Sequence, residues 1–289
     1  FTISPAIRRG FWCGKIATMT LTQSTVTQFQ DMIFSWWKDN RRDLPWRHTK
    51  NPYHILISEI MLQQTQVKRV IPKYAEFLAA LPDVYSLANA QPAQVLTLWR
   101  GLGYNRRALY FQKAAKVIVA DYRGIIPDSE SELIKLPGLG LYTARAIMVF
   151  AFEKNVAMVD TNIRQIITHY LFDGLPQKEK TILMTADRLV PAGRAWEWHQ
   201  ALMDFGALAM AKEKKAMHVV KKQAPFKDSD RYYRGRIIDV LRVNNAKETQ
   251  LVADFVREYG KTPVFFHRII DGLKKDGLLV KKKSMLALP

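Results

Sequence analysis

Leu136-Pro137-Gly138-Leu139-Gly140 is a Pro-Gly-x-Gly stretch between two segments with helical apolar spacing, and Asp160 follows twenty-two residues after Gly138. Because glycine lacks a side chain, such a turn lets the backbone approach another group closely. A helix that begins just after Gly140 would present N–H groups suited to a phosphate. The stretch therefore predicts either a turn that holds a nucleic-acid backbone near the Asp160 carboxylate, or an ordinary corner between helices with Asp160 as a helix cap.

The composition indicates an anionic partner. The chain of 289 residues has 44 Lys and Arg against 26 Asp and Glu, a formal net charge of +18 and a pI near 9.9. An excess of this size is typical of proteins that bind nucleic acid. Hydrophobic residues make up 48% of the chain, which is enough for about two domains with their own cores.

The same composition excludes several other classes of protein. Cys13 is the single cysteine, so neither disulfides nor a cysteine-rich metal site can organise the fold. No apolar run approaches the length that crosses a bilayer. We therefore expect a soluble intracellular protein, cytoplasmic or associated with the nucleoid, that does not interact with a membrane.

Residues 1–25 are expected to be an extension outside the folded domains. The first eighteen residues contain Arg8, Arg9 and Lys15 but no acidic residue. This pattern is found in organelle transit peptides. We favour the alternative that the extension is disordered or that the gene start is over-extended, with Met19 as the initiator.

From Thr25 to about Phe226, the apolar pattern predicts short helices separated by Pro and Gly, as in an all-α globule. A lysine-rich boundary follows near residues 212–230. Beyond it, residues 228–289 predict a winged-helix-like basic domain, with helices at 237–243, 249–256 and 263–273 and a hairpin around Lys281-Lys282-Lys283.

This C-terminal part carries much of the excess charge. From Lys212 to Pro289 the chain has 19 basic and 9 acidic residues. Basic residues on such a domain contact DNA phosphates without reading the base sequence. A structural or dimerisation role for the domain stays open as the alternative.

The segment Leu56–Val67 places one carboxyl group among apolar residues. If the segment is helical, Ile57, Ile60 and Met61 share an apolar face, while Glu59, Gln63 and Gln66 share a polar one. Removal from water lets a lone carboxyl group keep its proton and donate it near neutral pH. The segment predicts either a general acid at Glu59 or a solvated face of a helix.

Five motifs follow one another along the chain: Arg42-Asp43-Leu44-Pro45-Trp46-Arg47, Ser58-Glu59-Ile60-Met61-Leu62-Gln63-Gln64-Thr65, Gly101-Leu102-Gly103-Tyr104, Leu136-Pro137-Gly138-Leu139-Gly140 and Val159-Asp160-Thr161-Asn162. In this order and spacing they resemble the adenine DNA glycosylases of the MutY type, within the helix-hairpin-helix (endonuclease III) superfamily. The resemblance covers about residues 26–226.

The resemblance implies a two-lobed, all-α helix-hairpin-helix glycosylase fold. One lobe would combine residues 26–46 with 160–226, and the other would be a helical barrel of residues 47–159 that ends in the hairpin. Glu59 and Asp160 would face each other across a cleft that holds double-stranded DNA with a mismatched or damaged base pair. We expect a monomer.

The resemblance also implies a role for each matching residue in catalysis. Glu59 matches the general acid that protonates the flipped adenine at N7, and Asp160 matches the carboxylate that stabilises the developing sugar cation or bonds to it transiently. Asn162 matches a residue that hydrogen-bonds near these acids. Tyr142 stands where the lyase branch has a nucleophilic lysine, so a monofunctional glycosylase without lyase activity is expected.

Contacts with DNA follow in the same way. Gln64 and Tyr104 match the wedge residues, whose side chains enter the duplex stack as the target base leaves it. The other DNA-binding positions that the resemblance implies are Gln63, Pro137, Gly138, Leu139 and Gly140. The implied adenine pocket consists of Arg42, Leu44, Trp46, Arg47 and Gln200, and for Trp46 ordinary core packing is the alternative.

Two departures from the family are visible in the sequence. Family members commonly bind an iron–sulfur cluster through four cysteines, whereas the corresponding residues here are Met210, Met217, Val220 and Phe226. None of them supplies a thiolate, so we expect no cluster and apolar packing by these residues in its place. The tail of this chain also resembles a winged helix rather than the MutT-like domain that recognises 8-oxoguanine. No metal is expected in the chemistry, although a monovalent cation at the hairpin could bridge backbone carbonyls to phosphate.

Three functions remain open on the sequence. The first is excision of adenine paired with 8-oxoguanine or guanine. The second is a mismatch-specific thymine or uracil DNA glycosylase of the same fold, which would depend little on Glu59 because a pyrimidine has no N7. The third is a non-catalytic DNA-binding relative, against which the two intact acids argue.

Overall fold

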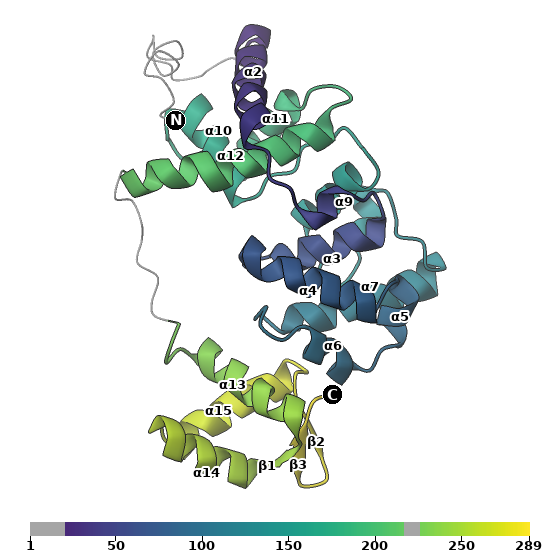
Figure 1. Cartoon of the computed structure of the whole chain (residues 1–289), viewed down its shortest axis with the longest axis vertical. Helices are drawn as coiled ribbons and strands as arrows, with labels where there is room; N and C mark the ends of the chain where they lie inside the picture. The colour runs from purple at the N-terminus through teal and green to yellow at the C-terminus, as the bar shows by residue number, and fades with distance from the viewer. Residues whose placement is uncertain (1–20, 217–225) are drawn as a thin grey trace. The chain divides into compact units, whose positions relative to one another are not determined.

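The computed structural model describes residues 21–216 and 226–289 (Figure 1). They form two compact units. Unit 1 comprises the described residues 21–41 and 157–216, and unit 2 comprises 42–156 and 226–289. The boundaries lie a few residues before those expected, so that residues 42–46 belong to unit 2. Of the expected extension of residues 1–25, residues 1–20 lie outside the described residues. For residues 21–25 the expectation is wrong, because Leu21 is buried and α2 begins at Gln23 with Thr22 as its cap.

Unit 1 is a bundle of four helices: α2 (Gln23–Asn40), α10 (Thr161–Leu171), α11 (Glu179–Leu189) and α12 (Ala195–Ala216) (Figure 1). Thr22 caps α2 by accepting a hydrogen bond from the Thr25 N–H at 3.2 Å. The buried residues of α2 recur at helical spacing, and they pack with α10 and α12 around Phe29 and Trp198.

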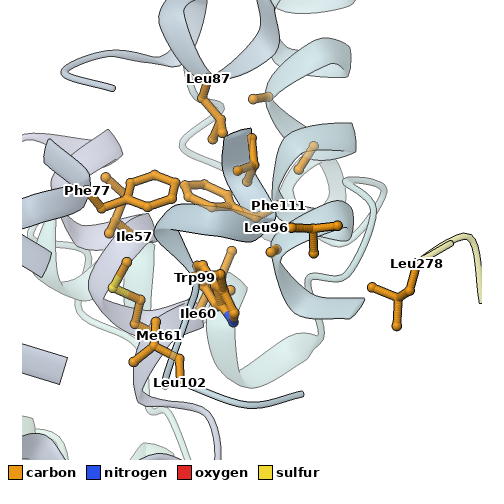
Figure 2. Close-up of a cluster of buried hydrophobic side chains, with 14 of the residues drawn as sticks. Ile57, Ile60, Met61, Phe77, Leu87, Leu96, Trp99, Leu102, Phe111 and Leu278 are labelled. Carbon is orange, nitrogen blue, oxygen red and sulfur yellow. The ribbon is translucent and has the colours of Figure 1, made fainter. Parts of the chain in front are cut away.

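The first part of unit 2 is a cluster of helices preceded by the 3-10 turn η1 (Pro45–Arg47). Its helices are α3 (Pro52–Leu62), α4 (Val67–Ala80), α5 (Val84–Asn89), α6 (Pro92–Leu98), α7 (Arg106–Tyr122), α8 (Glu130–Leu133) and α9 (Leu141–Phe150). The α3 helix is central, since every residue from Ile55 to Met61 is buried. Figure 2 shows Ile57, Ile60 and Met61 in one cluster with Phe77 and Phe111, whose rings stack at 5.9 Å.

The second part of unit 2, residues 226–289, is the C-terminal module. It contains α13 (Asp230–Val243), β1 (Ala246–Lys247), α14 (Glu248–Tyr259), α15 (Pro263–Lys275), β2 (Val280–Lys282) and β3 (Met285–Ala287). The strands form an antiparallel sheet in the order β1-β3-β2. Three helices with a basic hairpin confirm the expected winged-helix-like fold. Leu278 of the module belongs to the same apolar cluster as the α3 residues (Figure 2).

One sequence-based expectation for the helices is wrong. The helix expected over Leu56–Val67 ends at Leu62, and Gln66 precedes the next helix as its N-cap. The chain breaks between them because Gln64 has a left-handed backbone with φ of 53°. Gln63 and Gln66 therefore do not share a helical face with Glu59.

No helix in residues 21–216 and 226–289 combines the length and the apolar character that a membrane crossing requires.

Candidate functional site

The side chain of Glu59 is buried. It lies on α3 with 4% of its surface exposed, between Ser58 and Ile60, which are also buried. The alternative of a solvated helix face is therefore wrong. Withdrawing a carboxyl group from water costs free energy unless it is protonated or has polar partners, so glutamate is rarely placed in a core for packing alone.

Asp160 caps the N-terminus of α10. Its Oδ1 accepts a hydrogen bond from the Ile163 N–H at 2.7 Å, and its Oδ2 accepts one from Asn162 Nδ2 at 3.1 Å. Burial raises the pKa of this carboxyl group, although the hydrogen bonds from Ile163 and Asn162 act in the opposite direction. The capping role considered from the sequence is thus present, and the carboxylate is held at a partly buried position.

Gly206 allows α12 to approach Asn162 closely. A Cβ atom at Gly206 would lie 2.8 Å from the Cβ of Asn162, a distance that backbone movement alone could relieve. Packing therefore explains why glycine stands at this position, since the missing side chain lets α12 lie against the first turn of α10. Asn162, whose amide donates to Asp160, therefore lies directly against the backbone of α12.

The hairpin turn adopts the geometry that its glycines suggest. Gly138 has φ of +82°, and a Cβ there would lie 2.7 Å from the Cβ of Tyr110 on α7. Leu136 and Leu139 are buried, which anchors the turn on the core. As expected, α9 begins directly after Gly140, and its first backbone hydrogen bond runs from the Ala144 N–H to the Gly140 carbonyl. The N–H groups of residues 141–143 precede that bond, and this is the arrangement that favours an anion.

The two expected wedge residues share an uncommon backbone conformation. Gln64 has φ of 53° and Tyr104 has φ of 47°, and both side chains are exposed. A left-handed conformation is unfavourable for residues other than glycine, and it persists where surrounding contacts impose it. Gln63, next to the first wedge, donates through Nε2 to Thr143 Oγ1 at 3.3 Å, which joins the end of α3 to the first turn of α9.

Arg107, which the sequence analysis did not single out, holds both wedge loops. Its Nη1 donates to three carbonyls at the end of α3, those of Ile60, Met61 and Gln63, at 2.7, 3.1 and 2.6 Å. Its Nη2 donates to Thr65 Oγ1 and to the carbonyls of Leu102 and Gly103, at 3.0, 3.1 and 3.0 Å. The single guanidinium of Arg107 thus donates hydrogen bonds to the carbonyl groups that two loops leave without a helical partner.

The electrostatic setting of Arg107 is unusual for an arginine. Burial lowers its pKa to about 10, while the nearby Tyr104 acts in the opposite direction. In the sequence it is the second residue of an Arg-Arg pair, which is typical of an exposed helix start. The signal that could have identified it is its position three residues after Tyr104, in the first turn of the helix that follows the Gly-x-Gly-Tyr loop.

Replacing Arg107 by methionine is expected to lower the free energy of unfolding by roughly 2–3 kcal/mol, because several buried carbonyls lose their donor. Lysine at the same position should lose less, since an ammonium group still donates to some of them. Denaturant unfolding of both variants measures this difference. A methionine variant within 0.5 kcal/mol (about the effect of an ordinary surface substitution) would contradict the role of Arg107 as the clamp of these loops.

The residues expected to line a base pocket are distributed over both units. Leu44 and Trp46 are buried in the core of unit 2, where the Trp46 ring meets Tyr74 at 5.6 Å, so the core packing considered for Trp46 is present. Arg47 is buried and donates to the Arg42 carbonyl at 2.7 Å. Gln200 is buried on α12 of unit 1, and the half-buried Tyr142 lies in the first turn of α9.

The structure describes two of the four residues at the cluster positions, Met210 and Phe226. Met210 is buried in the core of unit 1. Phe226 is 55% exposed, and its ring meets that of Tyr232 at 5.8 Å in the C-terminal module. Met217 and Val220 lie outside the described residues. Among the described residues, no group of three or more His, Cys, Asp and Glu side chains is placed to hold a metal ion.

Residues 57–191 match the family model of the HhH-GPD superfamily base excision DNA repair protein. An adenine DNA glycosylase of Mycolicibacterium smegmatis is 34% identical over 268 residues, which cover 86% of this chain and 91% of the relative. An adenine DNA glycosylase of Buchnera aphidicola subsp. Baizongia pistaciae is 40% identical over 191 residues, 65% of this chain and 54% of the relative. The chain thus spans about half the length of one relative and nearly all of the other.

A solved structure of a thermostable thymine-DNA glycosylase has a TM-score of 0.61 at 33% identity, and the match covers 65% of this chain and 88% of that one. These similarities confirm the predicted glycosylase fold, the resemblance to MutY-type adenine DNA glycosylases and the expectation of a DNA glycosylase. Because the match to the mycobacterial relative extends over nearly its whole length, the chain belongs to the HhH-GPD superfamily of base excision DNA repair proteins.

Proposed function

We propose that this protein is a monofunctional DNA glycosylase that hydrolyses the N-glycosidic bond of adenine mispaired with 8-oxoguanine or guanine in double-stranded DNA. The observation that carries the proposal is the buried carboxyl group of Glu59, in the Ser-Glu-Ile-Met-Leu-Gln-Gln-Thr motif that ends at a wedge loop. Binding of DNA by itself requires no general acid.

In the proposed reaction Glu59 is the general acid. Its proton passes to N7 of the flipped adenine, the bond between C1′ and N9 breaks, and both electrons of that bond leave with the neutral base. Water then forms the new bond to C1′ and gives up a proton, which restores the acid. The burial of Glu59 supports this role, because it places the carboxyl group inside the protein and away from bulk water.

Asp160 is proposed to stabilise the positive charge that develops on the sugar, or to bond to it transiently. Burial raises the pKa of Asp160, which means that its carboxylate form is poorly solvated in the folded protein. A poorly solvated anion interacts strongly with a cation formed beside it, without solvent having to reorganise. Asn162 would keep the carboxylate in place through its hydrogen bond.

Tyr142 is proposed to limit the enzyme to base release. A lyase step requires an amine that forms a Schiff base with the sugar, and a phenol cannot form one. We expect a product that stays an intact abasic strand until it is treated with alkali.

The DNA would be bound by the hairpin residues Pro137, Gly138, Leu139 and Gly140, by Gln63 and by the wedges Gln64 and Tyr104. Phosphate would lie against the first turn of α9, with a monovalent cation bridging carbonyls of the turn to it. Arg42, Leu44, Trp46, Arg47 and Gln200 are proposed for the adenine pocket. A monomer acting at the nucleoid fits a substrate of this kind.

We also propose that no iron–sulfur cluster binds at positions 210, 217, 220 and 226, because methionine, valine and phenylalanine supply no thiolate. Purified protein is expected to contain no stoichiometric iron and to show no visible absorption band of a cluster. Metal analysis by mass spectrometry checks this. Stoichiometric iron bound after chelator treatment would contradict the proposal.

A thymine or uracil mismatch glycosylase is the second candidate, favoured by the similarity to the thymine-DNA glycosylase structure. Single-turnover base release from duplexes with A:8-oxoguanine, A:G, T:G and U:G pairs separates the two. Release of adenine alone supports the proposal. Release of thymine or uracil that persists in Glu59→Gln selects the second candidate, and tight binding without release leaves a DNA-binding relative.

A further inference from the structure

The C-terminal module packs on the loop that carries Tyr104. Four side chains of residues 100–106 each contact a residue of the module: Arg100 with Asp239 at 3.9 Å, Tyr104 with Arg231, Asn105 with Arg242 at 3.2 Å and Arg106 with Asp276 at 3.4 Å. Arg242 also donates to the Leu96 carbonyl of α6 at 3.0 Å, and α13 runs beside α6 (Figure 1). The module is therefore joined to this loop at several points.

Arg231 differs from the other arginines of α13. Arg234 pairs with Asp276, while Arg236 and Arg242 both pair with Asp239. In the part of the chain that the structure describes, Arg231 contacts no carboxylate. Its Nη1 donates to the phenolic oxygen of Tyr104. The exposed Arg231 guanidinium thus contacts a wedge residue rather than a carboxylate of the described chain.

The ring of Tyr104 lies against two guanidinium groups that restrict its orientation. The Arg231 guanidinium is 5.2 Å from the ring centroid, and the Arg107 guanidinium is 5.7 Å from it. Phe226 lies on Arg231 in turn, with its centroid at 5.2 Å from the guanidinium. The ring nevertheless remains 39% exposed. A side chain that is ordered before DNA arrives loses less conformational entropy when it enters the stack.

We propose that Arg231 is a positioning residue for base extrusion, which holds the Tyr104 ring in the orientation that enters the duplex and brings the charge of the C-terminal module to the phosphates beside it. The inference rests on the proposed function, which assigns Tyr104 as a wedge. It gives the module a part in mispair recognition beyond general attraction to DNA.

The test compares Arg231→Met, Arg231→Lys, Tyr104→Phe and the double variant Arg231→Met with Tyr104→Phe in the full chain. Arg257→Met is the matched control, because Arg257 is a highly exposed arginine of the same module that pairs with Asp254. The probe is a duplex with an A:G pair and 2-aminopurine next to the mispaired adenine, whose stopped-flow fluorescence rises when stacking is lost. Base release is followed on the same samples, and thermal unfolding verifies that each variant is folded.

We expect Arg231→Met to slow the fluorescence rise about tenfold, as loss of a hydrogen bond from a charged donor implies. Tyr104→Phe should slow it similarly and the double variant no further, since both changes remove one interaction. Arg231→Lys should recover part of the rate, and Arg257→Met should match the wild type.

Three results would overturn the inference. The first is a fluorescence rise in Arg231→Met as fast as in the wild type, and the second is a double variant whose rate loss equals the sum of the two single losses. The third is weaker DNA binding by Arg231→Met with a fluorescence rise at the normal rate, which would mean that Arg231 only contacts a phosphate. If the wild-type protein unstacks the adenine but does not release it, the proposed function is refuted. The positioning role would then still be tested by the rate of the fluorescence rise in Arg231→Met. A wild type that does not unstack the adenine would refute the positioning role as well.

Discussion

Adenine release by Glu59→Gln is expected to be slower than that of the wild type by about 10²–10⁴-fold in single turnover, the range that a general acid contributes. Glutamine has nearly the same size and remains able to hydrogen-bond, so the packing of α3 around this position should survive. What it lacks is a proton that can pass to N7 of the base. The loss should therefore fall on the chemical step and leave the affinity for the mispaired duplex within a few fold.

The matched control for this experiment is Glu76→Gln. Glu76 is half exposed and pairs with Lys73 on the surface of α4, so its loss removes a carboxylate from the same unit without touching the proposed site. Its rate should equal that of the wild type. If Glu59→Gln released adenine at the wild-type rate, Glu59 would not be the acid, and its burial would need another reason.

Asp160→Asn is expected to lower the rate of adenine release by about 10³-fold, comparable to the loss of a strong electrostatic contact to the transition state. It is also expected to make the folded protein more stable at neutral pH. Burial raises the pKa of Asp160 above its ordinary value of 3.8, so the folded state disfavours the ionised form. An amide caps the helix as well as a carboxylate does and can accept the hydrogen bond from the Ile163 N–H.

The pH dependence of this stabilisation has a definite sign. Because the pKa of Asp160 is higher in the folded chain, its contribution to stability is full below pH 3.8 and is lost as the pH rises through the folded value. The gain from Asp160→Asn should therefore be largest near pH 8 and should shrink as the pH falls toward 4. Urea unfolding of both proteins at pH 5 and pH 8 measures it.

Comparison of Asp160→Ala with Asp160→Asn separates the effect of the carboxylate charge from the effect of the helix cap. Alanine removes both the carboxylate and the acceptor for the Ile163 N–H, and loss of a cap costs about 1 kcal/mol. This variant should be inactive and less stable than Asp160→Asn at every pH. An asparagine variant that is less stable than the wild type at pH 8 would show that the carboxylate is held by favourable contacts rather than strained by burial.

Local pattern was sufficient for most of the secondary structure. The hairpin turn, the start of α9 after Gly140 and the cap at Asp160 follow from glycine, from apolar spacing and from a polar residue before a helical run. The three helices and the hairpin of the C-terminal module were predictable for the same reason. The end of α3 at Leu62 was not, because the sequence from Leu56 to Val67 continues a helical pattern and the left-handed Gln64 has no local cause.

The sequence by itself determined the helical fold, the winged-helix-like tail, the family and the identity of the candidate acids. Each of these follows from short local motifs or from the spacing of apolar residues along the chain. Only the tertiary structure decided that Glu59 is buried and that Arg107 closes two loops, one of them through the Ile60 carbonyl 47 residues away. It also decided that Arg231 reaches Tyr104 across 127 residues. A backbone carbonyl or an exposed tyrosine can accept a hydrogen bond from any donor that the folded chain places beside it. The sequence therefore contains no pattern that identifies Arg107 or Arg231 as the donor.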